Sequence, residues 1–141
     1  ALDVSIQVQI LNLLLDLREK RNLTMLFIAH DLAAVEYLCD QIIVMYLGRI
    51  VEAGPAAPVY RQPAHPYTQA LLSAIPQPDP RAIRNRQVLS DDIPSPLNPP
   101  SGCVFRTRCR LADQTCAEIR PEPVNAGPTH VSYCLKTESA A

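Results

Sequence analysis

Four cysteines near the C-terminus could together bind a metal ion or a metal cluster. They are spaced C-x5-C-x6-C-x17-C, and they are Cys103, Cys109, Cys116 and Cys134. Clustered thiolates are the usual ligands of structural zinc and of iron–sulfur clusters. This spacing differs from the paired C-x2-C of zinc ribbons and from the bacterial ferredoxin run. The fifth cysteine, Cys39, stands apart near the end of a predicted apolar helix and suits a buried core thiol.

Three interpretations of the four cysteines remain open on their spacing. In the first, they bind a 4Fe-4S cluster, whose irons occupy a larger volume than one zinc ion and suit longer gaps between ligands. The basic residues interleaved with them would offset the negative charge of such a cluster; these are Arg106, Arg108 and Arg110. In the second, the cysteines bind Zn2+ as a structural staple. In the third, they are reduced thiols or disulfides packed in a Pro-rich module.

One histidine and one aspartate could act on a phosphate group. His30 follows a short apolar run and directly precedes Asp31, which is a good helix N-cap. Ligands of α/β sheets bind beyond the carboxyl ends of strands, so His30 could donate a hydrogen bond to a phosphate oxygen or polarise a water. From position alone, a histidine that only ends the strand is the commoner case. Asp3 precedes the first predicted helix, where an acid usually serves the helix dipole.

The elements that would position these residues lie mainly in the first 75 residues. An amphipathic helix is predicted over 5–20 from its apolar stripe, which consists of Ile6, Ile10, Leu13, Leu14 and Leu17. The apolar run 24–29 shows no alternation and predicts a strand buried on both faces of a parallel sheet. A helix follows over about 32–39. Residues 41–46 and 49–52 then predict a strand and a return strand around the turn Leu47-Gly48.

The chain divides into parts of different character. Residues 1–54 predict the C-terminal part of an α/β domain with a parallel sheet and a terminal hairpin. Residues 55–75 predict short helices at 56–61 and 66–75. Residues 76–141 contain ten of the 14 prolines and predict an extension with little regular structure. Because the chain starts with Ala and its first helix needs a preceding partner strand, we expect a fragment of a longer protein.

Composition argues against several classes of protein. The net charge is −1, and residues 76–141 carry seven acids and eight bases, so no basic surface for nucleic acid is expected. No apolar run approaches the ~20 residues that cross a bilayer, and the N-terminus shows no signal-peptide pattern. We expect a cytosolic protein, or one bound to a membrane through protein partners.

Several segments resemble parts of ABC-transporter ATPases. Residues 1–3, Ala-Leu-Asp, resemble the D-loop. Residues 24–32 resemble the strand that carries the switch histidine of these enzymes, and residues 41–54 resemble the hairpin that follows it. Two further segments, 65–72 and 93–105, resemble the oligopeptide and dipeptide importer ATPases in particular. The match covers nearly all of the chain in the right order.

This resemblance implies a fold, a reaction and partners. The chain would be the C-terminal part of an ABC-type nucleotide-binding domain, starting at the D-loop, from an ATPase that uses ATP with Mg2+. His30 would contact the γ-phosphate, and Asp3 would contact the opposite subunit of a dimer. The partners would be a second ATPase subunit, two membrane permease subunits and, indirectly, a solute-binding protein, at the cytoplasmic side of the membrane. Because some members of the family hold a 4Fe-4S cluster in this extension, the resemblance also favours the cluster over zinc.

The sequence also departs from a complete ATPase. No G-x-x-x-x-G-K-S/T phosphate loop is present, and neither are the signature motif and the acidic strand that holds magnesium. Binding and hydrolysis of ATP rest mainly on those parts, so we expect this polypeptide alone to be inactive. The alternative is a stand-alone metal-binding or Fe-S-binding module with a structural or interaction role. The transported solute stays open between peptide, glutathione and nickel.

Overall fold

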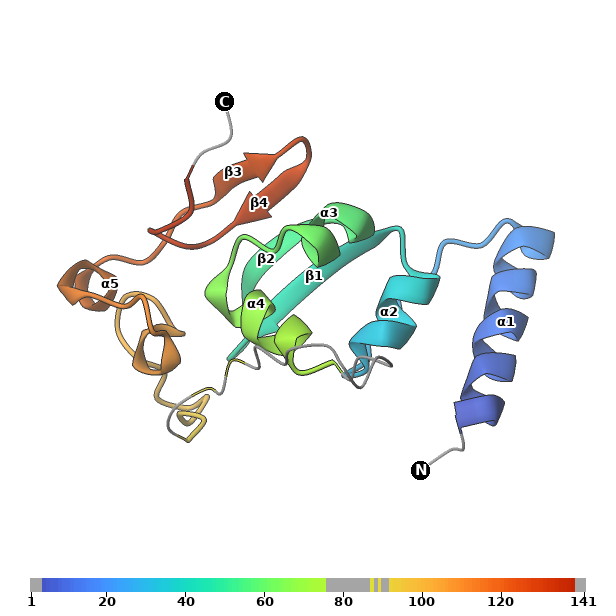
Figure 1. Ribbon diagram of the computed structural model, residues 1–141, viewed down its shortest axis with the longest axis horizontal. Helices are drawn as coiled ribbons and strands as arrows, with labels where there is room; N and C mark the ends of the chain where they lie inside the picture. Colours follow the sequence, from blue (N-terminus) through green and yellow to red (C-terminus); the bar gives the residue numbers. More distant parts are fainter. Residues whose placement is uncertain (1–3, 76–86, 88, 90–91, 139–141) are drawn as a thin grey trace, which may run out of the picture. The chain divides into compact units, whose positions relative to one another are not determined.

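A computed structural model describes residues 4–75, 87, 89 and 92–138 of the chain (Figure 1). The chain forms two compact units, residues 1–40 and residues 41–141. No helix among the described residues is both long enough and apolar enough to cross a membrane.

The first unit contains two helices, α1 (Val4–Arg21) and α2 (Leu32–Leu38). They pack through a small core of Leu11, Ala34 and Leu38. The end of α1 follows from Asn22, which has φ 48°. The N–H of Leu23 donates to the carbonyl of Arg18 at 3.0 Å, and that of Asn22 donates to Glu19 at 3.3 Å. These two bonds form a Schellman motif, which satisfies the last carbonyls of the helix.

The strand predicted over residues 24–29 does not form. These residues have no regular structure, and the side chains of Leu26 and Ile28 are 89% and 88% exposed. A strand of a parallel sheet needs hydrogen-bonded neighbours, and the described residues of the first unit contain no other strand. The predicted parallel sheet is therefore not confirmed, while the two helices that flank it are.

The second unit is built on a four-stranded antiparallel sheet. Its order is β1-β2-β4-β3, and the strands are β1 (Gln41–Tyr46), β2 (Arg49–Pro55), β3 (Val124–Gly127) and β4 (His130–Ser132). The predicted β1–β2 hairpin is confirmed. Its turn residues Leu47 and Gly48 have φ 45° and 72°, the positive values that match the twist of a two-residue hairpin turn. Side chains alternate along β1, so that Ile42, Val44 and Tyr46 are buried.

Four short helices accompany this sheet. They are α3 (Ala56–Arg61), α4 (Pro66–Ser73), the 3-10 helix η1 (Arg106–Arg108) and α5 (Gln114–Glu118). Three aromatic rings join β1, α4 and the segment before η1. The ring of Tyr46 lies 4.8 Å from that of Tyr67 and 5.2 Å from that of Phe105, between centroids. Phe105 is 1% exposed, which makes it one of the most deeply buried side chains of the second unit.

The extension carries more regular structure than its proline content predicts. In its described residues, β3 and β4 form a hairpin that continues the sheet, because β4 pairs with β2 through Glu52–Ser132 and Ala53–Val131 (Figure 1). The prolines fall outside β4, so its N–H groups remain free to pair. Residues 92–101, by contrast, contain no helix or strand, as predicted. Residues 76–86 of the predicted extended segment lie outside the described residues.

Candidate functional site

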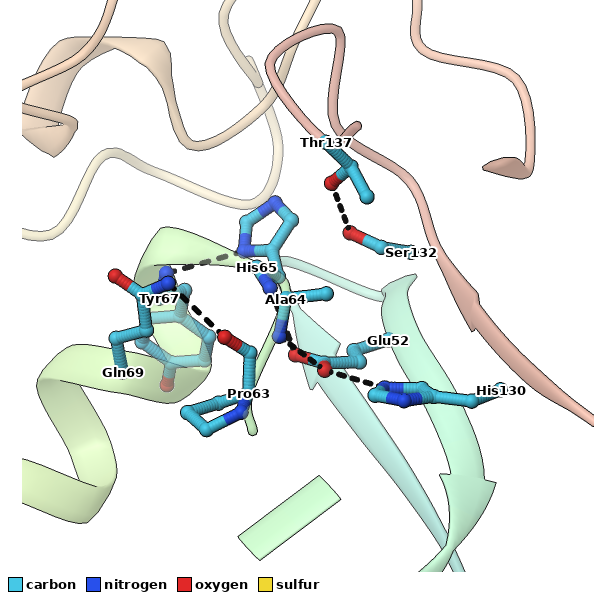
Figure 2. Close-up of polar contacts among 9 residues, drawn as sticks. All are labelled: Glu52, Pro63, Ala64, His65, Tyr67, Gln69, His130, Ser132 and Thr137. Carbon is cyan, nitrogen blue, oxygen red and sulfur yellow. Dashed lines mark hydrogen bonds and ion pairs between the residues drawn. The ribbon is translucent and has the colours of Figure 1, made fainter. Parts of the chain in front are cut away.

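A buried carboxylate lies at the centre of the second unit. Glu52, on β2, is 0% exposed and accepts hydrogen bonds from three donors (Figure 2). Its Oε1 atom lies 2.7 Å from the backbone N of Ala64 and 2.7 Å from Nε2 of His130, and its Oε2 atom lies 3.0 Å from the backbone N of His65. Because a carboxylate only accepts, the Nε2 atom of His130 carries the hydrogen of this bond.

Local backbone geometry brings His130 to Glu52. His130 is 3% exposed and lies at the start of β4, next to β2. Gly54 makes the approach possible, because a Cβ atom there would lie 3.1 Å from both Cα and Cδ2 of His130. Any larger residue at position 54 would push the imidazole away from the carboxylate.

His65 has a different task in the same cluster. Its Nδ1 atom accepts a hydrogen bond from the N–H of Tyr67 at 3.1 Å, so it caps the N-terminus of α4 (Figure 2). Burial lowers the pKa of His65 to about 4, which keeps the ring neutral and able to accept. The pairing of Glu52 with His130 was not foreseen, and no spacing or motif in the sequence signals it.

His30 lies exposed between the irregular segment 24–29 and α2. The neighbouring Asp31 is fixed as the predicted N-cap, because its Oδ1 atom accepts from the N–H groups of Ala33 and Ala34 at 3.0 and 3.4 Å. Its Oδ2 atom accepts from Nε2 of Gln7 on α1 at 2.7 Å, and this hydrogen bond lowers the pKa of Asp31. His30 thus stands on a fixed support with its ring open to a ligand. Asp3 lies outside the described residues.

The four cysteines of the predicted metal site gather in one part of the second unit. None forms a disulfide; Cys103, Cys116 and Cys134 are buried, and Cys109 is half-buried. The N–H of Cys103 donates to the carbonyl of Cys116 at 2.8 Å. Gly102, with φ 63°, allows this contact, because a Cβ atom there would lie 2.4 Å from the same carbonyl oxygen. Burial raises the pKa of Cys103 and of Cys109, and the charge of the neighbouring cysteines adds to both shifts.

The fit to a metal ion is less favourable than the spacing predicted. Among the described residues, no group of three or more His, Cys, Asp or Glu side chains is placed to hold a metal ion. The prediction of zinc or a 4Fe-4S cluster at these cysteines therefore has no support from the geometry of the side chains.

Fold and site together are compatible with the C-terminal part of an ABC-type ATP-binding domain, an α/β class of protein. Residues 51–116 match the family model described as "Oligopeptide/dipeptide transporter, C-terminal region". The chain is 59% identical over 136 residues to the "Putative peptide import ATP-binding protein" of Brucella ovis, covering 96% of this chain and 43% of that protein. It is 51% identical over 138 residues to the "Oligopeptide transport ATP-binding protein OppF" of Haemophilus influenzae, covering 96% and 42%. The corresponding protein of Escherichia coli is 51% identical over 140 residues, covering 98% and 42%.

Residues 51–116 thus match the C-terminal region of the oligopeptide/dipeptide transporter family, and nearly all of the chain is similar to proteins named as peptide import or oligopeptide transport ATP-binding proteins. The chain spans less than half the length of the curated relatives that it matches. The resemblance read from the sequence is confirmed.

The Glu52 cluster yields a test of stability. In Glu52→Gln, one buried N–H group would face an amide donor instead of an oxygen, so we expect the second unit to lose roughly 3 kcal/mol of unfolding free energy. Urea denaturation followed by near-ultraviolet circular dichroism of the tyrosines measures this loss. Glu118→Gln is the matched control, because Glu118 is exposed and bonds only to Gln114 one turn away on α5, and it should leave the midpoint unchanged. Equal midpoints for both variants would contradict the role assigned to Glu52.

Proposed function

We propose that the whole protein is the ATP-hydrolysing subunit of an ABC importer for di- or oligopeptides. One observation carries the proposal: 96% of the chain aligns, at 51–59% identity, with proteins named as peptide import or oligopeptide transport ATP-binding proteins. Identity at this level across the hairpin and the extension argues for a common role. The alternative of a stand-alone metal-binding module receives no support from these relatives.

In this proposal His30 contacts the γ-phosphate of ATP. Its exposed ring beside the capped start of α2 supports the role, since Asp31 and Gln7 fix the backbone that carries it. A hydrogen bond from the imidazole to the terminal phosphate would stabilise charge that develops during hydrolysis. Asp3 would contact the opposite subunit of an ATPase dimer. The phosphate loop and the magnesium ligands would belong to the part of the relatives that this chain does not span.

The partners follow from the same proposal. Two ATPase subunits would pair and dock on two membrane permease subunits at the cytoplasmic face of the membrane, and a solute-binding protein would deliver the cargo. The names of the relatives favour peptides over glutathione or nickel as that cargo. Hydrolysis would then reset the transporter after each transport step.

The test uses the full-length protein with its partner ATPase. We expect His30→Ala to bind ATP with unchanged affinity and to hydrolyse it at least roughly a hundredfold more slowly, because the residue acts on the transition state. Glu36→Ala, an exposed change on α2 a few residues away, is the matched control and should keep the wild-type rate. A His30→Ala protein with normal turnover would refute the assigned role.

We further propose that Cys103, Cys109, Cys116 and Cys134 bind a 4Fe-4S cluster in the assembled protein. The donor set supports this, since all four thiols are free, share one neighbourhood and are mostly buried. The cluster would require the side chains to move from their present positions, because they do not converge on a metal ion. When bound, it would cross-link four points of the extension and stabilise it.

Anaerobic purification followed by iron and sulfide analysis tests this assignment. We expect about four irons and four sulfides per chain, as such a cluster requires, and their loss in Cys109→Ser. Cys39→Ser is the matched control, because Cys39 packs against the core of the first unit instead. A protein with neither iron nor sulfide would disprove the cluster and leave the ATPase proposal intact.

A further inference from the structure

A pocket of about 320 Å³ opens in the second unit, between the β1–β2 turn and the extension. Three polar side chains line it, each from a different segment: Arg49 at the start of β2, Arg120 after α5, and Tyr133 after β4. The rest of the wall includes apolar and rigid residues such as Val51, Pro99 and Pro121. A concave site with an apolar wall and a few convergent polar groups is the usual form of a small-molecule site.

The charges in this pocket are unbalanced. Among the described residues, no Asp or Glu lines it. Neither Arg49 nor Arg120 forms an ion pair within the part of the chain that the structure describes. The Tyr133 hydroxyl likewise has no hydrogen-bond partner among the described residues. In the described part of the chain, the pocket therefore gathers two positively charged donors and one hydroxyl donor without an acidic acceptor for them.

These donors stand on well-supported backbone. Arg49 directly follows the turn at Leu47 and Gly48 and pairs with Tyr46 of β1. The N–H of Tyr133 donates to the carbonyl of Val51 at 2.8 Å, which ties the end of β4 to β2. Arg120 precedes Pro121, whose ring limits the local backbone. The backbone that carries the donors is thus held by the sheet and the turn, while the side chains of Arg49 and Arg120 are exposed and accessible to a ligand.

We propose that this pocket binds a small molecule that carries an oxyanion next to an apolar group. Carboxylates and phosphates accept hydrogen bonds from guanidinium groups, often in bidentate geometry, and the phenol of Tyr133 adds a further donor. The apolar part of the wall, which includes Val51, would cover the body of the ligand. This site is separate from His30 and does not depend on the proposed ATPase function, and it shares one lining residue, Cys103, with the proposed cluster site.

Isothermal titration of the full-length, nucleotide-free protein tests the proposal with three probes. The dipeptide glycyl-leucine supplies a carboxylate beside an apolar side chain, glycyl-leucinamide lacks only the charge, and inorganic phosphate lacks the apolar part. We expect glycyl-leucine to bind saturably and the amide to bind at least tenfold more weakly. Arg49→Gln and Arg120→Gln should each weaken glycyl-leucine at least tenfold, while Arg110→Gln, an exposed arginine outside the pocket, should not.

Several outcomes would overturn the proposal. They are an absence of saturable binding by glycyl-leucine, equal affinity for the amide, or equal weakening by Arg110→Gln. In another outcome, phosphate binds as tightly as glycyl-leucine and loses this binding in Arg120→Gln. That result would overturn the part of the proposal that requires an apolar group in the ligand. Near-ultraviolet circular dichroism of each variant confirms that the aromatic contacts of Tyr46 and Phe105 are kept, so that weaker binding is not a folding defect.

Discussion

The buried carboxylate of Glu52 constrains the whole second unit. Removing a carboxylate from water costs several kcal/mol unless hydrogen bonds replace the lost water. Here the replacement donors come from the loop before α4 and from β4, and the partner on β4 is 78 residues away in sequence. The β1–β2 hairpin, the helical segment and the extension must therefore be in place together for Glu52 to be satisfied. The extension is for this reason an integral part of the sheet and not an appended tail.

Other features of the second unit also hold the β1–β2 hairpin and the extension together. Gly54 leaves room for the imidazole of His130, and the rings of Tyr46, Tyr67 and Phe105 pack together where the hairpin meets α4 and the extension. Ser132, on β4, is fully buried and accepts a hydrogen bond from the hydroxyl of Thr137 at 2.9 Å (Figure 2). Polar groups buried at this junction are paired, as a stable interior requires. The two exceptions among the described side chains are the hydroxyls of Tyr46 and Thr68.

Local signals in the sequence predicted the local elements. The helix at 5–20, the Asp31 cap and the strand at 41–46 each depend on near neighbours, and each forms. The predicted apolar stripe of that helix was wrong as its buried face, because Leu11 is buried while Ile6, Ile10, Leu13 and Leu17 are exposed. The strand at 24–29 failed because a strand depends on neighbours that hydrogen-bond to it, and none lies in the described first unit. The β3–β4 hairpin was missed since β4 has three residues, too few to show a period. The pairing of Glu52 with His130 was not predicted, because only the fold brings these two residues together. The positions of His30 and the cysteines were predictable, but the roles assigned to them remain proposals.

Hydrogen exchange of individual amides tests most directly whether Glu52 holds the hairpin, the α4 loop and β4 as one unit. The amides of Ala64 and His65 donate to Glu52, and that of Tyr133 donates to Val51. If Glu52 couples these segments, the free energy of the opening that lets these amides exchange equals that of the β1–β2 amides. Both free energies then depend on denaturant concentration in the same way. If Ala64 and His65 exchange rapidly while the β1–β2 amides stay protected, the carboxylate does not couple these segments, and the central claim is wrong.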